Sequence, residues 1–346
     1  MTTQPMTAQP PTIRPLPTEP VRLEIGINGA FLTRRWEEPD NWMRLTRECG
    51  FTVHSFCGDV IDPFFSGDRS FQLEQAHAAH EAATRYGVTI CDLYTGVATH
   101  RFHGLSHSDP RARQRMKEWL HSAAELAVAM GTDALGGHWD AFSCEVLADT
   151  ARTATATQQL YTTFRELAQE LKPLGIRVLM QEQMYIPSEK PCTLQECEDF
   201  LIAVNADNAD AIPVLATLDV GHQAGMHYGL SGDDLDYLAW LRRFASVSEV
   251  IHLQQTTPEA SHHWPFTEEY NRRGHVDIEK ALEAIRYSHV HHSEQPHAAV
   301  LPPVKQHWLI GEIIPGSTKT ESVLLSELTE SAAYLRRFIP EGGMTL

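Results

Sequence analysis

Short apolar runs alternate along the chain with longer segments that carry apolar residues at helical spacing. Segments such as 116–130, 160–174 and 281–288 place apolar residues three or four positions apart, as on one face of a helix. The runs between such segments have the length and composition of buried strands: 23–28, 52–57, 88–94, 133–138, 176–182, 214–220, 249–255 and 307–313. Strands that are each followed by a helix predict a parallel sheet covered by helices.

Eight such units in 346 residues suit a closed (β/α)8 barrel in the α/β class. An open, doubly wound sheet has similar local patterns and is the alternative. The phosphate-binding patterns G-x-G-x-x-G and G-x-x-x-x-G-K-[ST] are absent, which favours the barrel. We therefore expect one (β/α)8 domain over residues 21–346, preceded by a proline-rich, poorly ordered tail over residues 1–20.

Local signals agree with this division. Gly131 is expected to end the helix before the fourth strand, and Thr193 with Glu196 forms a predicted capping box. The segment before the eighth strand carries His289, His291, His292 and His297 among prolines, and we expect a solvated insertion rather than a metal site.

Four side chains that can bind metal stand at the ends of four predicted strands: Glu182, Asp219, His252 and Glu312. The carboxyl ends of barrel strands meet on one face, so these side chains are expected to converge. Buried carboxylates are costly unless they are paired or bound to a cation. Separate salt bridges are the alternative for any one of them, but four on four strands predict a divalent metal site.

The ligand types indicate which metal fits. Three carboxylates and one imidazole favour Mn²⁺, with Mg²⁺ or Co²⁺ as alternatives, and no cysteine pattern indicates a thiolate zinc site. Positions left open on the metal could take a carbonyl and a neighbouring hydroxyl of a sugar, which would acidify the C–H bond between them.

The composition argues against nucleic acid and membranes as partners. With 45 acidic and 28 basic residues the formal net charge is −17, which opposes binding to nucleic acid or to an anionic membrane. Six scattered cysteines predict free thiols in a reducing compartment. No apolar stretch approaches membrane-spanning length and no leader is evident, so a cytoplasmic location is expected.

The same strand ends suggest a mechanism. Glu182 and Glu312 come from well-separated strands, so one can remove a proton from an enediolate precursor while the other returns it on the opposite face. His138 and His222 are placed to donate hydrogen bonds to substrate oxygens, although each could be an ordinary buried histidine. Gln254, His263 and Trp264 follow the seventh strand and are predicted to contact substrate or exclude water, with loop packing as the alternative.

The order of Glu182, Asp219-x-x-His222, His252 and Glu312 resembles the xylose isomerase-like superfamily of metal-dependent sugar isomerases and epimerases. The segment HLQQTTPEASHHWPFTEEYNRRG is similar to a subgroup that includes the tetrulose-phosphate isomerases or racemases of erythritol catabolism. The resemblance implies a (β/α)8 barrel with these four metal ligands, a substrate contact for His222 and a dimer or tetramer. It also implies epimerisation of a short ketose or ketose phosphate through a metal-bound cis-enediolate.

Other functions remain open from the sequence. The same scaffold could act as a metal-dependent carbon–carbon lyase on 3-oxo sugars, of the sugar-acid decarboxylase or carbon-glycoside deglycosidase type. A DNA-repair endonuclease is disfavoured by the acidic charge, and a noncatalytic sugar-binding barrel by the ligand set. If the substrate carries phosphate, Arg272, Arg273 or Lys319 could bind it, but we expect solvated surface charge at each.

Overall fold

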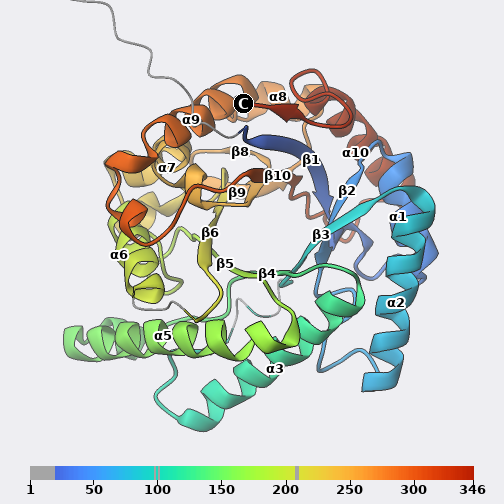
Figure 1. Ribbon diagram of the computed structural model, residues 1–346. Helices are drawn as coiled ribbons and strands as arrows, with labels where there is room; N and C mark the ends of the chain where they lie inside the picture. Colours follow the sequence, from blue (N-terminus) through green and yellow to red (C-terminus); the bar gives the residue numbers. More distant parts are fainter. Residues whose placement is uncertain (1–19, 97–98, 100–101, 207–209) are drawn as a thin grey trace, which may run out of the picture.

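The structure is a computed structural model that describes residues 20–96, 99, 102–206 and 210–346. A closed barrel of parallel strands forms its centre (Figure 1). Its strands, in barrel order, are β1 (Arg22–Asn28), β2 (Val53–Cys57), β3 (Thr89–Tyr94), β4 (Ala134–Gly137), β5 (Val178–Glu182), β6 (Val214–Asp219), β7 (Val250–Leu253) and β10 (Gln306–Gly311). The predicted tail lies, apart from Pro20, outside the described residues.

The pairing of the first and last barrel strands closes the sheet. β10 runs parallel to β1 with Ile25 opposite Leu309, and it also pairs with β7. An open sheet would leave these edges unpaired, so the predicted (β/α)8 barrel is confirmed. A short strand, β11 (Met344–Thr345), adds antiparallel to the start of β1.

Helices surround the barrel as an outer layer (Figure 1). They are α1 (Pro39–Glu48), α2 (Arg69–Tyr86), α3 (Pro110–Ala129), α4 (Cys144–Leu147), α5 (Thr150–Glu170), α6 (Leu194–Asn205), α7 (Tyr237–Phe244), α8 (Glu268–Arg273), α9 (Ile278–Val290) and α10 (Glu321–Leu335). Their apolar faces and the apolar strand residues form one continuous core. Among the described residues, none of the helices is both long and apolar enough to cross a membrane.

The predicted helix ends are found largely as expected. Gly131 follows α3 with a left-handed φ of 84°, a conformation that glycine adopts without steric cost. Thr193 Oγ1 accepts a hydrogen bond from the Glu196 backbone N–H, but the Glu196 carboxylate accepts from Cys192 N–H and not from Thr193 N–H. The six cysteines are free, as predicted, and only Cys144 is exposed.

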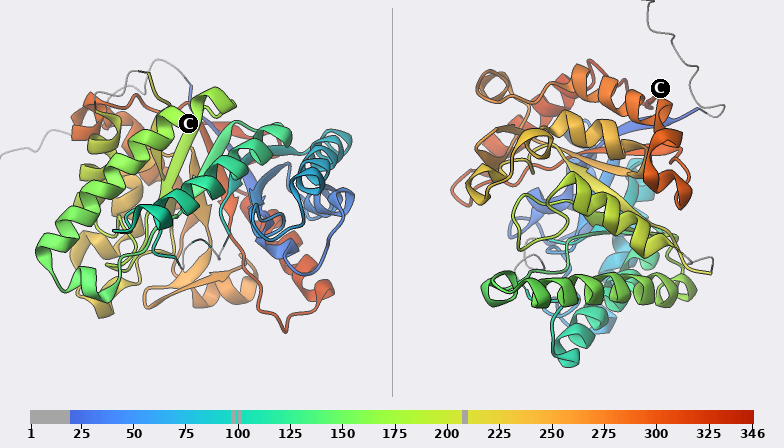
Figure 2. Two further views of the ribbon diagram at one scale, coloured as in Figure 1. Left: turned by 90° about the horizontal axis from the view of Figure 1, so that it is seen from below. Right: turned by 90° about the vertical axis from the view of Figure 1, so that its left-hand side faces the viewer.

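Two segments differ from the sequence-based expectation. The seventh predicted strand, 249–255, is shorter: β7 ends at Leu253, and Gln255 begins a hairpin of β8 (Gln255–Thr257) and β9 (Ala260–Trp264). The left view of Figure 2 shows this hairpin and the segment before α10 projecting from the same end of the barrel.

The expected solvated insertion before β10 is wrong. His289, His292 and His297 are buried, and each ring has at least one nitrogen within hydrogen-bond distance of a protein group. His297 Nδ1 lies 2.9 Å from Glu198 Oε1, and His289 Nε2 lies 2.7 Å from His307 Nε2. The segment therefore packs against the body of the barrel.

Candidate metal centre and active site

Four side chains converge at the carboxyl ends of the strands. Glu182 ends β5, Asp219 ends β6, His252 lies within β7, and Glu312 directly follows β10. All four are buried, and one potential ligand atom from each lies within 4.8 Å of the others. The barrel thus brings together the residues that the sequence analysis singled out as candidate metal ligands.

His252 lies at the centre of this cluster. Its Nδ1 is 3.0 Å from Glu182 Oε1, 3.4 Å from Glu312 Oε2 and 4.0 Å from Asp219 Oδ2. Its Nε2 is buried without a hydrogen-bond partner among the described residues. Nδ1 is therefore the imidazole atom that faces the carboxylates.

The charges in this cluster fit a divalent cation. Of the described residues, no lysine or arginine forms an ion pair with Glu182, Asp219 or Glu312, and the basic side chains close to them are histidines. Three buried carboxylates without a permanent cation are energetically unfavourable unless a metal or protons neutralise them. Glu182, Asp219, His252 and Glu312 are the residues that could hold the metal.

The electrostatic environment gives the three carboxyl groups different pKa values. Burial raises the pKa of Asp219 to about 6. Burial also acts to raise the pKa of Glu182 and Glu312, but the nearby His252 outweighs it and lowers both, that of Glu312 strongly. Both glutamates are therefore ionised at neutral pH and able to accept a proton.

Two glutamines hold Asp219 and His222 in place. Gln254 Nε2 lies 3.0 Å from both carboxylate oxygens of Asp219. Gln183 Oε1 accepts a hydrogen bond from Asp219 N–H at 2.7 Å, and the Gln183 carbonyl oxygen lies 3.0 Å from His222 Nδ1. Sequence reasoning missed Gln183, although its place next to Glu182 in the MQEQ run was an available signal.

A cavity of about 450 Å³ opens beside the cluster and gives a substrate access to it. Glu182 and Glu312 line it together with His222 and His263. His222 Nε2 is 3.5 Å from Asp219 Oδ2, and His263 Nδ1 is 3.4 Å from Glu312 Oε2. Two of the three histidines predicted to contact substrate, His222 and His263, thus face the same space as the two glutamates. Tyr185, which the sequence analysis did not single out, also lines this space and packs its ring 5.2 Å from His222.

The other predicted contacts take different positions. His138 is fully buried and does not line this cavity; its Nε2 is 2.8 Å from the Asp140 carbonyl oxygen and its Nδ1 is 2.9 Å from Gln181 Nε2. Its geometry supports a structural role in place of the expected substrate contact. Gln254 is likewise behind the cavity wall, and Trp264 stacks on His262 at 3.9 Å.

Comparison with known proteins agrees with the fold. Residues 43–309 match the family described as "Xylose isomerase-like TIM barrel". A D-erythrulose 1-phosphate 3-epimerase of Brucella abortus (strain 2308) is 26% identical over 267 residues, which cover 76% of this chain and 83% of the relative.

Solved structures share the architecture at lower identity. A protein of Rhodospirillum rubrum, provisionally classed as a xylose isomerase, superposes with a TM-score of 0.77 at 21% identity, covering 92% of this chain and all of that one (100%). A D-psicose 3-epimerase of Clostridium cellulolyticum H10 gives a TM-score of 0.61 at 17% identity, over 91% of this chain and 98% of that one. The relatives' names are those of sugar isomerases and epimerases, which confirms the predicted enzyme class. The chain belongs to the xylose isomerase-like TIM barrel family.

Proposed function

We propose that the protein is a divalent-metal-dependent epimerase of a short ketose phosphate, similar in size to a tetrulose phosphate. One observation carries the proposal: two glutamates and two histidines line one cavity at a cluster of four side chains that could bind a metal. The name of the Brucella relative, a D-erythrulose 1-phosphate 3-epimerase, supports the choice of substrate class.

The metal would be held by Glu182, Asp219, His252 and Glu312, with Mn²⁺ favoured and Mg²⁺ or Co²⁺ as alternatives. When bound, it supplies a Lewis acid that polarises the substrate carbonyl and lowers the pKa of the adjacent C–H bond.

The two glutamates carry out the proton transfers in this scheme. Glu182 and Glu312 approach from β5 and from the end of β10, which are separated by two strands in the barrel. One carboxylate removes the proton beside the carbonyl to give an enediolate, and the other returns a proton on the opposite face. This exchange inverts the carbon without breaking the carbon chain.

The histidines position the substrate in this scheme. His222 and His263 line the cavity and can donate hydrogen bonds to substrate oxygens as negative charge develops on the enediolate. His222 is itself oriented by the Gln183 carbonyl oxygen at 3.0 Å.

Solvent exchange tests the proposal directly. The Mn²⁺-loaded protein is incubated in deuterated water with D-erythrulose 1-phosphate, and deuterium uptake at C3 is followed by NMR. We expect uptake in the wild type and a loss of at least about 100-fold in Glu182→Gln and in Glu312→Gln. Glu269→Gln, on exposed α8, is the matched control and should exchange like the wild type.

Two outcomes would contradict the proposal. Near wild-type exchange in either glutamate variant would exclude the two-carboxylate scheme. Carbon–carbon cleavage without exchange would indicate a lyase. The single domain over 21–346, the cytoplasmic location and a dimer or tetramer stay predictions.

A further inference from the structure

A second cavity adjoins the one beside the ligand cluster. Its volume is about 550 Å³, and it lies between the turn after β1 and the segment after β10. Ala30 and Ile314 line both cavities, so the two spaces meet at these residues. A substrate whose reacting carbons lie at the cluster could therefore extend into this second space.

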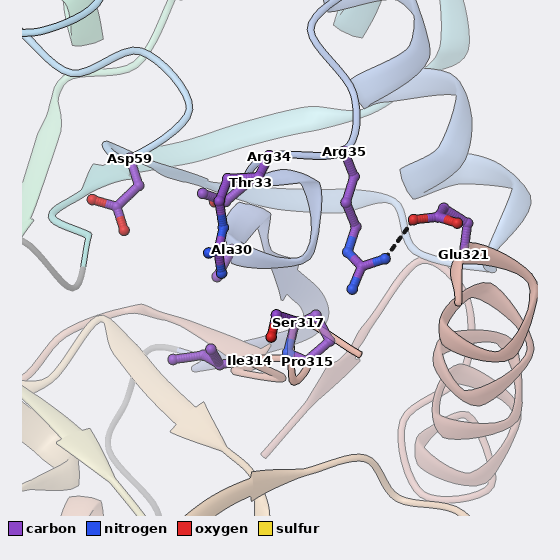
Figure 3. A pocket seen from close by; sticks show the side chains of 9 residues that line it. All are labelled: Ala30, Thr33, Arg34, Arg35, Asp59, Ile314, Pro315, Ser317 and Glu321. Atoms are coloured by element: carbon purple, nitrogen blue, oxygen red, sulfur yellow. Dashed lines mark hydrogen bonds and ion pairs between the residues drawn. The ribbon is translucent and has the colours of Figure 1, made fainter. Parts of the chain in front are cut away.

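Arg34 and Arg35 lie on one side of this second cavity, and Ile314, Pro315 and Ser317 lie across from them (Figure 3). The charge of Arg35 is already balanced. Its Nη1 is 2.5 Å from Glu321 Oε1, and its Nη2 donates to the Gly316 carbonyl oxygen at 3.2 Å. Arg35 thus ties the two loops together and is not available to a ligand.

Arg34 differs from Arg35 in two ways: its charge is unpaired, and its backbone conformation is unusual. Its guanidinium has no hydrogen bond or ion pair within the part of the chain that the structure describes. Its φ of 63° lies in the left-handed region, which residues with a Cβ atom rarely adopt. Such strain is often found where it points a side chain at a ligand.

A hydroxyl group at the same cavity also lacks a strong hydrogen-bond partner. Thr33 Oγ1 is buried and has no hydrogen bond to the described residues, and only the weakly bonding thiol of Cys57 lies beside it. A buried polar atom without a partner requires an explanation, and a bound ligand is one. An unpaired guanidinium next to hydroxyl groups is the donor set that a phosphate group needs.

We propose that this second cavity is the phosphate subsite and that Arg34, with Thr33 and Ser317, binds the phosphate group of the ketose phosphate. The inference rests on the proposed function and adds the group that selects phosphorylated substrates. Asp59 also lines the cavity and would repel an anion, so the phosphate belongs on the side of Arg34 and Ser317.

The cations considered from the sequence are less suited to this role. Arg272 and Arg273 form ion pairs with Glu268 and Glu269 on exposed α8, and Lys319 pairs with Glu327. The two arginines are exposed, as expected, whereas Lys319 is half-buried against Glu327. Arg34 was not a candidate, because nothing in the sequence shows that its loop turns toward the strand ends.

The test compares D-erythrulose 1-phosphate with unphosphorylated D-erythrulose as substrates for C3 proton exchange. We expect the wild type to prefer the phosphorylated ketose, and Arg34→Asn to reduce that preference, as the ratio of kcat/KM values, by about 30- to 100-fold. Asparagine tolerates a left-handed backbone, so the variant removes the guanidinium without adding strain. Arg34→Lys keeps the charge but not the planar guanidinium group, so its preference should lie between those of the wild type and Arg34→Asn.

Arg272→Asn removes the same charge from an exposed helix and should retain the wild-type preference. An unchanged ratio in Arg34→Asn would overturn the phosphate subsite and leave the epimerase proposal intact. If neither ketose exchanges, the epimerase proposal fails, and calorimetry of the Mg²⁺-loaded protein with inorganic phosphate decides on the subsite. Loss of phosphate binding in Arg34→Asn but not in Arg272→Asn would support it, and equal binding in both would refute it.

Discussion

Gln254 Nε2 lies 3.0 Å from each carboxylate oxygen of Asp219, so the amide group fixes the orientation of a candidate metal ligand. Groups that orient ligands in this way commonly contribute about 10- to 100-fold to metal affinity. We predict that Gln254→Met, which keeps the side-chain volume, weakens Mn²⁺ binding by that factor in calorimetry. Gln195→Met, at an exposed position of α6, is the control, and equal affinity in both variants would refute a positioning role for Gln254.

Removal of the metal should lower thermal stability as well as activity. A ligand at 100 times its Kd stabilises the folded state by about 2.7 kcal/mol, so chelation should lower Tm by several degrees, and added Mn²⁺ should restore it. Asp219→Asn should abolish this shift, because it removes a ligand from the cluster. Asp199→Asn, at an exposed position, should keep the wild-type response to Mn²⁺. A shift that persists in Asp219→Asn would place the metal elsewhere.

Buried neutral histidines make the fold sensitive to acid. Burial lowers the pKa of His54 to about 3, and burial together with the charge of His289 lowers that of His307 to about 3. Their stabilisation is fully present above the unfolded pKa of about 6.5 and is lost as the pH falls toward 3, because the unfolded state then binds more protons.

Below pH 6.5, each of these histidines should make the free energy of unfolding fall by about 1.4 kcal/mol for every pH unit of acidification. His54→Gln or His307→Gln should therefore reduce the drop in unfolding free energy between pH 7 and pH 5 by about 2 kcal/mol in urea titrations. For each variant, the difference between the unfolding free energies at pH 7 and pH 5 does not contain the pH-independent cost of the substitution. His77→Gln, at an exposed position, should leave the slope unchanged, and an equal slope in all variants would rule out these two groups.

Glu198 joins the histidine-rich segment to the barrel. Its carboxylate is 2.7 Å from His297 N, 2.9 Å from His297 Nδ1 and 2.9 Å from Arg243 Nε, and its side chain is only 2% exposed. Breaking a buried ion pair on one side leaves the partners uncompensated, so Glu198→Ala should lower the free energy of unfolding by about 3 kcal/mol. Glu294→Ala, which affects a more exposed pair with His291, should cost less than about 1 kcal/mol. Similar losses in the two variants would contradict this account.

The barrel and its ligand cluster could be predicted because both follow from local rules. Alternating strand and helix patterns dictate a parallel sheet, and parallel strands bring their carboxyl ends together whatever the sequence separation. That is why Glu182 and Glu312 could be grouped from the chain alone, before any distance between them was known.

Side-chain direction and loop conformation could not be predicted in the same way. His138 and His222 both follow strands, but only His222 lines the cavity, because the ring of His138 is held by Asp140 and Gln181. The exposed Arg34 could not be recognised, because neither its left-handed backbone nor its position across from the segment after β10 follows from a local sequence pattern. Burial of His297 likewise depended on a partner 99 residues away in the chain, Glu198.

The candidate ligands are contributed one at a time during synthesis, and the last of them follows the strand that seals the cylinder. A growing chain that stops short of β10 lacks both Glu312 and the neighbour that β1 and β7 require. At the proposed metal site, binding of the cation would thereby be coupled to completion of the fold. A truncated or incompletely folded product would keep the other three candidate ligands, but the open sheet would not bring them together into a complete metal site.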